Sequence, residues 1–233
     1  MKTIKTLLVL ALVLFTFTDA FSTSLVTAKE SSITQNSKKY HYNVTAKYPL
    51  IEGGEYGAGN NKFNKLMDNT INKKIKEFIS DVKHDDIGID ELPEELRNYT
   101  MDIKSSFSEP FPGIATVEFE TYSFYAGRAH PLTVLEAMNF DLRNGKVLQL
   151  QGLFSKKPEY LNSLSSYCKK HSKVPISFEE GIEPKPENFE NFLITKTGLK
   201  IIFNAYQIAP YAAGPSDVTI PFSYLSLKFP LKD

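Results

Sequence analysis

The chain has 233 residues, of which 42% are hydrophobic and 23% charged, and its formal net charge is zero. This composition is typical of a folded globular protein and argues against a disordered chain. A neutral chain also lacks the positive field on which nucleic-acid binding depends, so we expect no nucleic-acid partner.

The first 20 residues have the pattern of an export signal. Lys2 and Lys5 precede an apolar run over residues 7–17, and Thr18-Asp19-Ala20 supplies the small residues of a cleavage site. The run is shorter than the roughly 20 residues of a membrane-spanning helix. We therefore predict a signal peptide over residues 1–20, no stable membrane span after cleavage, and a periplasmic or secreted protein. An uncleaved anchor is the alternative.

The next segments predict a lead-in, a strand and a long helix. Residues 21–38 are polar and rich in Ser and Thr, which favours a flexible lead-in. Alternation over residues 40–46 predicts a strand, and Pro49, Gly53 and Gly54 predict the turn that ends it. One helix is predicted over residues 61–82, because apolar side chains recur at helical spacing. They are Phe63, Met67, Ile71, Ile75, Phe78 and Val82.

An acidic connector over residues 83–97 leads into a predicted antiparallel meander. Its first two strands, over residues 99–104 and 114–125, have alternating sequences, and residues 132–142 are predicted as another strand. Asn144-Gly145 is a signal for a type I′ hairpin, which would pair residues 147–150 back onto the last strand.

The remaining pattern predicts a second helix and a second group of strands. The helix covers residues 158–171, and a proline-rich loop follows it. The last elements are strands over residues 189–195, 199–206 and 218–220 and a short helical segment within residues 221–227. The order predicts an α+β fold, with two principal helices packed on a mainly antiparallel sheet. It also fits two similar lobes over residues 39–142 and 143–233.

Motifs for catalysis or metal binding are absent from the sequence. The four histidines do not have zinc-ligand spacing, and no nucleophile or phosphate-loop motif occurs. We therefore predict no catalytic residue, no metal and no cofactor, and we favour a protein that is not an enzyme. Cys168 is the sole cysteine, so no intramolecular disulfide forms, and its helical spacing from Leu161 and Leu164 favours a core residue over a reactive thiol.

Two loops combine tyrosines with small residues, Gly and Pro. They are Tyr125-Ala-Gly-Arg-Ala-His-Pro131 and Tyr206-Gln-Ile-Ala-Pro-Tyr-Ala-Ala-Gly-Pro215. Tyrosines on rigid turns are good binding anchors, since they offer a ring and a hydroxyl and lose little entropy on contact. The loops either staple the end of the sheet or form a ligand groove, and the two interpretations are compatible. The candidate ligand-binding residues are Tyr125, Arg128, His130, Tyr206 and Tyr211.

The same segments carry a resemblance to a known family. In order along the chain they include Tyr122-Ser-Phe-Tyr-Ala-Gly-Arg-Ala-His-Pro131, Asn139-Phe-Asp-Leu-Arg-Asn-Gly-Lys146, Tyr206-Gln-Ile-Ala-Pro-Tyr-Ala-Ala-Gly214 and Val218-Thr-Ile-Pro-Phe222. Over roughly residues 40–229 the chain resembles the extracytoplasmic domain of RsiV-type anti-sigma factors. It is also similar to the non-catalytic N-terminal region of PdaC-type peptidoglycan deacetylases.

The resemblance implies an exported α+β module that binds something in the cell envelope, which is lysozyme in the RsiV type. Only six residues precede the apolar run and no deacetylase sequence follows the module, so we expect neither sigma-factor control nor deacetylation. Arg128 stands where the family loop more often has a small residue. The expected partner is therefore a lysozyme-like protein or peptidoglycan. The alternatives are a cell-wall hydrolase that uses His130 with Glu118 or Glu120, and a structural envelope subunit.

Overall fold

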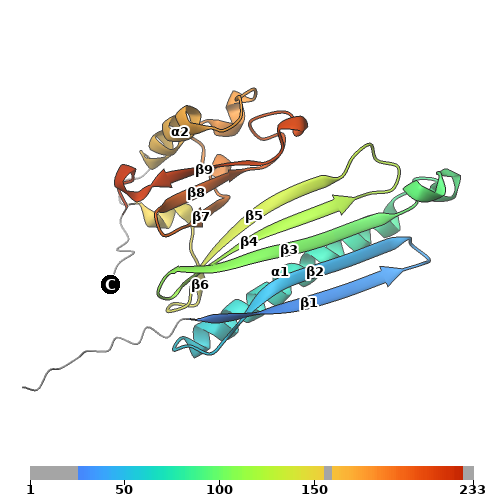
Figure 1. Ribbon diagram of the computed structural model, residues 1–233, viewed down its shortest axis with the longest axis horizontal. Helices are drawn as coiled ribbons and strands as arrows, with labels where there is room; N and C mark the ends of the chain where they lie inside the picture. Colours follow the sequence, from blue (N-terminus) through green and yellow to red (C-terminus); the bar gives the residue numbers. More distant parts are fainter. Residues whose placement is uncertain (1–25, 155–158, 228–233) are drawn as a thin grey trace, which may run out of the picture.

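The computed structural model describes residues 26–154 and 159–227 and divides them between two β-sheets (Figure 1). The first sheet contains β1 (Thr27–Ser37), β2 (Tyr42–Glu52), β3 (Tyr99–Phe111), β4 (Ile114–Phe124), β5 (Leu132–Asp141) and β6 (Lys146–Val147), in that spatial order. The second contains β7 (Phe192–Ile194), β8 (Gly198–Phe203) and β9 (Ser216–Pro221). The helices are α1 (Gly57–His84) and α2 (Tyr160–His171). The predicted α+β class, with a mainly antiparallel sheet and two principal helices, is confirmed.

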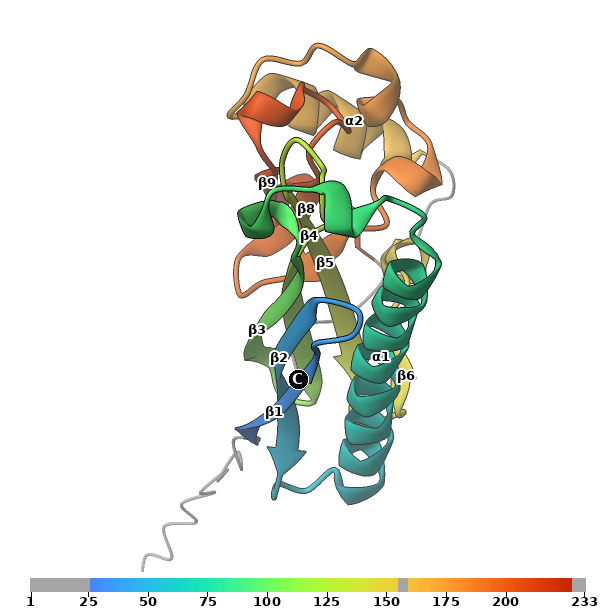
Figure 2. The ribbon, with the colours of Figure 1, turned by 90° about the vertical axis from the view of Figure 1, so that its right-hand side faces the viewer.

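Helix α1 covers one face of the six-stranded sheet (Figure 2). All six apolar positions predicted for its inner face are buried. The helix joins β2 to β3, which are parallel neighbours in the register Tyr42↔Tyr99 to Ala46↔Ile103. Parallel neighbours cannot be joined by a tight turn and need a crossover connection, and α1 supplies it. None of the helices in the described ranges has the length and hydropathy needed to cross a bilayer.

Strand β1 corrects the flexible lead-in that was predicted over residues 21–38. Residues 27–37 pair antiparallel with β2 along their whole length, from Thr27↔Glu52 to Ser37↔Tyr42. The strand is at the edge of the sheet and mostly exposed, so its backbone hydrogen bonds form with few apolar side chains, of which Ile33 packs against the core. Its polar sequence therefore resembles a loop. The predicted signal peptide over residues 1–20 lies outside the described residues.

Strand β2 also runs further than predicted, through Pro49 to Glu52. Proline lacks the N–H that a central strand must donate to a neighbour. The register between β2 and β3 ends at Ala46↔Ile103, so Pro49 has a paired strand on one side only, which is β1. The predicted turn therefore begins later, at the glycines.

The turn between β5 and β6 differs from the predicted type I′ hairpin. The pair Asp141↔Lys146 closes a four-residue loop, and of its residues only Gly145 has positive φ, at 62°. A type I′ turn needs positive φ at both central residues. Strand β6 ends at Val147, and the Leu148 N–H donates one more hydrogen bond, to the Asn139 carbonyl at 2.7 Å.

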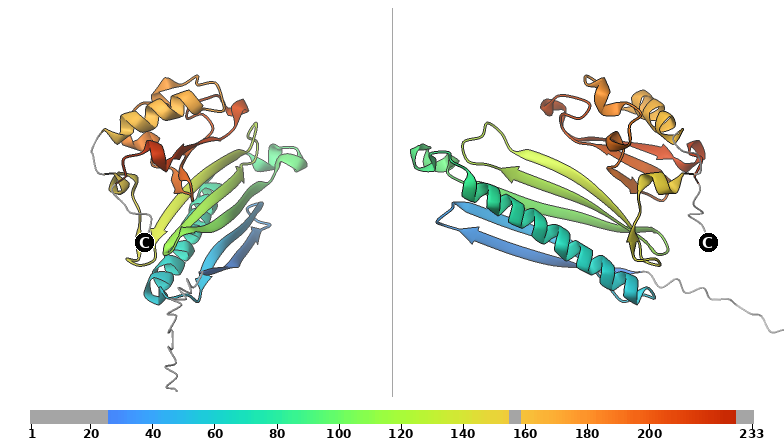
Figure 3. Two further views of the ribbon diagram at one scale, coloured as in Figure 1. Left: turned by 60° about the vertical axis from the view of Figure 1, so that its left-hand side comes forward. Right: turned by 180° about the vertical axis from the view of Figure 1, so that it is seen from behind.

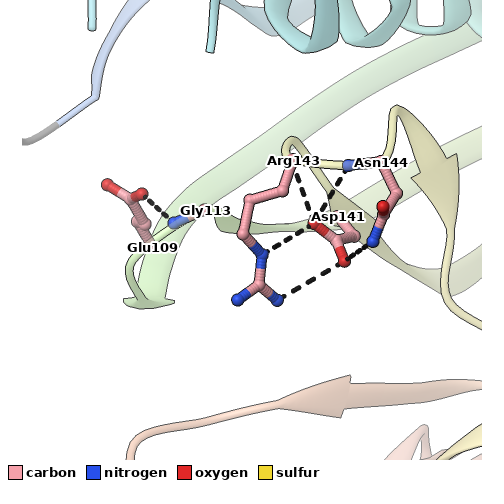
Figure 4. A network of polar contacts seen from close by, with 5 residues as sticks. All are labelled: Glu109, Gly113, Asp141, Arg143 and Asn144. Carbon is pink, nitrogen blue, oxygen red and sulfur yellow. Dashed lines mark hydrogen bonds and ion pairs between the residues drawn. The ribbon is translucent and has the colours of Figure 1, made fainter. Parts of the chain in front are cut away.

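A side-chain network explains the longer loop (Figure 4). Asp141 is buried, and its carboxylate accepts hydrogen bonds from the backbone N–H groups of Arg143 and Asn144, at 2.9 and 3.4 Å, and from their side chains. Burial by itself raises the pKa of Asp141, but these hydrogen bonds and the Arg143 charge bring the pKa below its ordinary value. In the neighbouring turn, the Glu109 carboxylate accepts the N–H of Gly113 at 2.8 Å.

The three-stranded sheet lies against the face of the first sheet that α1 leaves open. Side chains alternate along β4: Val117 and Phe119 join the core under α1, whereas Glu118 points the other way and forms an ion pair with Lys200 of β8. Helix α2 packs on β9, so the second sheet and its helix form a smaller body beside β4 and β5 (Figure 3).

Two hydrophobic clusters follow the two sheets. One contains buried residues between 26 and 142, and the other contains residues between 150 and 225 together with Ile114. Cys168 is fully buried in the second cluster, as a core residue would be. The division into similar lobes at residues 142 and 143 stays a prediction, and β6 belongs to the first sheet. The predicted start of the second helix at Pro158 lies outside the described residues, and α2 begins at Tyr160.

Candidate functional site

Three of the five candidate residues meet where the loop after β4 touches the loop between β8 and β9. The ring of Tyr211 stacks on the imidazole of His130, with centroids 4.0 Å apart and an interplanar angle of 27°. The Tyr211 hydroxyl donates a hydrogen bond to the Pro131 carbonyl at 2.6 Å. Tyr206 lies beside Tyr211 at a centroid distance of 5.7 Å. We call His130, Tyr206 and Tyr211 the aromatic corner.

The backbone under the aromatic corner is held by side chains. Tyr206 has φ of 68°, a left-handed conformation that is uncommon for a residue with a Cβ, and its N–H donates to the Ala209 carbonyl at 3.1 Å. The Gln207 amide donates to the carbonyls of Gly181 and Asn188 at 3.2 and 3.1 Å. The side chain of Tyr206 is 54% exposed. The loop therefore presents an aromatic ring to solvent on a fixed backbone.

Tyr125 is part of the packing under α1. Its ring packs against Phe78 and Tyr99, at centroid distances of 5.3 and 6.1 Å, and its hydroxyl donates to Asp81 at 3.3 Å. Burial, reinforced by the charge of Asp81, raises the pKa of Tyr125 to about 12. Tyr125 therefore anchors the loop to the C-terminal end of α1.

Arg128 lies on the exposed tip between these two places. Its backbone N–H donates to the Tyr125 carbonyl at 3.1 Å. The preceding Gly127 has φ of 69°, and a Cβ there would be 2.4 Å from the Ile87 side chain. The tight turn thus explains the glycine, and it leaves the side chain of Arg128 on the surface.

His130 is not brought to the glutamates of β4. Its Nδ1 lies 2.9 Å from the Pro131 carbonyl and its ring stacks on Tyr211. In the register of β4 and β5, Glu120 is opposite Leu135, and His130 lies beyond the end of the paired region at Leu132. At about 3.4 Å per residue, that end is already about 10 Å from Leu135. Glu118 lies farther away still.

A cleft between the two sheets was not predicted. It has a volume of about 350 Å³, and its floor is the open face of β3 and β4 while its wall comes from β7 and β8. A neighbouring hollow of about 210 Å³ shares Ser106 and Glu118 with it and continues toward Leu135. We call the two hollows together the inter-sheet cleft. The polar residues that line it include Ser106, Ser108, Thr116, Glu118, Glu120, Lys104, Lys196 and Lys200.

Three asparagines fix the second sheet against β5, and we call them the asparagine clamp. Asn139 is 2% exposed; its amide donates to the Phe192 carbonyl at 2.7 Å and its carbonyl accepts the Ile194 N–H at 2.7 Å. The Leu135 N–H donates to the Asn204 side-chain oxygen at 2.8 Å. The Leu135 carbonyl accepts from the amides of Asn191 and Asn204 at 2.8 and 3.0 Å.

The described residues contain no group of three or more His, Cys, Asp and Glu side chains placed to hold a metal ion. Burial raises the pKa of the Cys168 thiol to about 12, which keeps it protonated and unreactive at neutral pH. The described residues offer an exposed aromatic corner and a polar cleft on a two-sheet frame.

Fold and site together define an α+β module with two sheets and an exposed aromatic corner. Residues 152–223 match the family model "Protein of unknown function (DUF3298)". Two solved DUF3298 structures share the fold. The structure from Bacteroides fragilis has a TM-score of 0.62 at 19% identity and covers 88% of this chain and 95% of its own. The structure from Pseudomonas aeruginosa PAO1 has a TM-score of 0.58 at 14% identity and covers 89% and 95%.

Curated relatives match only in part. Peptidoglycan-N-acetylmuramic acid deacetylase PdaC of Bacillus subtilis is 24% identical over 202 residues, which are 84% of this chain and 40% of the deacetylase. Immunogenic protein MPT64 of Mycobacterium tuberculosis is 27% identical over 137 residues, which are 57% of this chain and 59% of that protein. The chain thus spans less than two thirds of the length of either relative. The resemblance to RsiV-type proteins stays a prediction.

Proposed function

We propose that this chain is a non-catalytic binding module of the bacterial cell envelope, periplasmic or secreted, that recognises a cell-wall component or an envelope protein such as lysozyme. The likeness to PdaC supports the envelope context, because that relative is named for its action on peptidoglycan. The likeness covers most of this chain but a minor part of the deacetylase. This partial coverage fits a binding module that is joined to a catalytic domain in the deacetylase.

The observation that carries the proposal is the aromatic corner. Tyr206 of this corner is more than half exposed, and its backbone is in a left-handed conformation. Strained backbone of this kind is concentrated at functional sites, because it persists only where the surroundings enforce it. An exposed ring with little freedom loses little entropy on binding and stacks on the apolar face of a sugar or of another side chain.

Arg128 adds a cation to the same end of the molecule. Its exposed guanidinium offers hydrogen-bond donors in a fork that matches a carboxylate. Peptidoglycan carries carboxylates on its peptides, and proteins carry them on their surfaces. Arg128 would thus add specificity to contacts that the aromatic corner makes.

The hydrolase alternative has no observation in its favour, because His130 contacts neither Glu118 nor Glu120 and the Glu118 carboxylate is paired with Lys200 at 2.6 Å. A structural envelope subunit needs no exposed aromatic ring on a strained backbone. Binding is therefore the function that the geometry supports best.

The test is retention of the purified protein by isolated peptidoglycan and by immobilised lysozyme. We expect one of the two to retain it, and Tyr206→Ala to weaken that binding at least tenfold, the effect of removing an anchoring aromatic. Tyr224→Ala is the matched control, since Tyr224 is 48% exposed and belongs to the segment after β9, away from the corner. The proposal fails if neither partner retains the wild-type protein above background.

A further inference from the structure

The inter-sheet cleft is a candidate binding site separate from the aromatic corner. The even-numbered side chains of β3 and β4 form its floor, on the face opposite α1, and β8 closes it from above through Lys200. Ser106 and Ser108 are exposed, so the cleft is open to solvent along β3. Its larger part, about 350 Å³, is within the size range of small-molecule sites.

The polar groups of the inter-sheet cleft include both hydrogen-bond donors and hydrogen-bond acceptors. The hydroxyls of Ser108 and Thr116 lie 3.1 Å apart on neighbouring strands. Beside them, the Lys200 ammonium contacts one oxygen of Glu118 at 2.6 Å. The ammonium has three N–H donors and the carboxylate has two oxygens, so the pair keeps both donors and acceptors available.

The charges also balance, which excludes a polyanion. Lys104, Lys196 and Lys200 are the cations that line the cleft, and Glu118 and Glu120 are its carboxylates, with Asp102 paired to Lys104 at 3.4 Å. A ligand with many phosphates or carboxylates would meet as many repelling groups as attracting ones. A ligand rich in hydroxyls and amides matches a surface with both donors and acceptors. The cleft also has apolar walls.

The apolar walls come from both sheets. Pro110 lines the cleft from β3, and Leu193 lines it from β7. Sugar rings have apolar faces and polar edges, so a cleft with apolar walls and a polar floor is suited to them. The asparagine clamp holds β7 at a fixed distance from β5, so the width of the cleft is set before a ligand arrives.

We propose that the inter-sheet cleft binds a linear, uncharged glycan of N-acetylated sugars, with the Glu118–Lys200 pair as its central hydrogen-bonding group. The choice of ligand class rests on the proposed envelope function, whereas the location of the site rests on the geometry of the cleft. Strand β8 runs from Lys200 to Phe203, which is about 10 Å, and the loop that carries Tyr206 follows it. The cleft and the aromatic corner are thus attached to the same strand.

The experiment is calorimetric titration with a soluble tetramer of N-acetylglucosamine. Ser106→Phe fills the cleft from an exposed position on β3, and we expect it to weaken binding at least tenfold. Thr34→Phe, at an exposed position on the edge strand β1 that lines neither hollow, is the matched control and should bind as the wild type does. Glu118→Gln keeps the shape of the side chain and should weaken binding about tenfold to a hundredfold, the cost of one charged hydrogen bond.

The outcomes separate this inference from the proposed function. If Ser106→Phe binds the tetramer as the wild type does while Tyr206→Ala does not, the cleft is not the site and the proposed function stands. If the wild type binds lysozyme but neither tetramer nor peptidoglycan, the glycan inference fails alone. Should Ser106→Phe not fold, amide NMR shifts of the wild type decide: shifts at Ser106, Thr116 and Lys200 support the cleft, and shifts confined to the corner overturn it.

Discussion

Replacing Asn139 with Ala should be among the most destabilising changes in the protein. The side chain is almost fully buried in β5 and makes two hydrogen bonds of 2.7 Å to the backbone of β7. In the alanine variant, the Phe192 carbonyl and the Ile194 N–H lose these partners inside a strand whose three residues are all buried. A buried polar group without a partner costs about 1–3 kcal/mol.

The expected loss in the free energy of unfolding is therefore about 2–5 kcal/mol. For a chain of this size, each kcal/mol lowers Tm by about 2–4 °C, which gives a decrease of about 4–20 °C. Urea denaturation followed by circular dichroism measures the loss. Asn36→Ala is the control, because Asn36 is an exposed residue of β1, and the change should stay within about 0.5 kcal/mol.

Asn139→Asp sharpens the same test through pH. The carboxylate retains an acceptor for Ile194 but faces the Phe192 carbonyl without a proton to donate. Burial should raise the pKa of this carboxyl above its value in the unfolded chain, so the folded state binds the proton more tightly. The free energy of unfolding should then rise as the pH falls through the folded pKa, and level off below the unfolded value of about 3.9. A loss below about 0.5 kcal/mol in Asn139→Ala, or no pH response in Asn139→Asp, would refute the clamp.

Three further predictions test the frame. Gly59→Ala should cost at least about 2 kcal/mol in urea denaturation, because its Cβ would lie 1.8 Å from the Leu142 carbonyl oxygen, whereas Gly57→Ala, with nothing within 4 Å, should be neutral or stabilising. The stability that Asp141 contributes should be present above its unfolded pKa and lost as the pH falls through its lowered folded pKa. The difference between the wild type and Asp141→Asn should therefore shrink between about pH 5 and about pH 2; a constant difference would contradict the hairpin network. Cys168 should not react with a thiol reagent in the native protein, and should react fully in denaturant.

The sequence predicted the elements whose side chains face a core. Helix α1 is recognisable because a buried face must repeat at helical spacing, and its inner residues from Phe63 to Val82 are the predicted ones. In strand β4, Val117 and Phe119 face the core and Glu118 faces the other way, so its sequence alternates for the same reason. Strand β1 contacts the core through Ile33 but is otherwise mostly exposed, so its polar sequence carried no alternating strand signal although its backbone is fully paired with β2.

The site was predictable only where local sequence determines it. The glycines and prolines of the two tyrosine loops predicted tight turns, and the loops do meet through His130 and Tyr211. The different environment of Tyr125 depends on α1, more than 40 residues earlier in the chain, so no local pattern revealed it. The inter-sheet cleft likewise joins β3 and β4 to β8, and its one local sign was the run of polar residues at alternate positions of β3.

The Glu118–Lys200 pair is hard to explain by stability alone. Its side chains are only 22% and 24% exposed, so both charges have lost much of their water. A well-packed apolar pair of similar volume stabilises a fold as well or better, because it avoids that desolvation cost. The two sheets are already joined by the asparagine clamp, whose side-chain amides form hydrogen bonds with the backbone. What the ion pair adds is an acceptor on the floor of the cleft and a donor on its wall, both in fixed positions. A hydroxyl-rich ligand requires this arrangement, and attachment of the sheets does not.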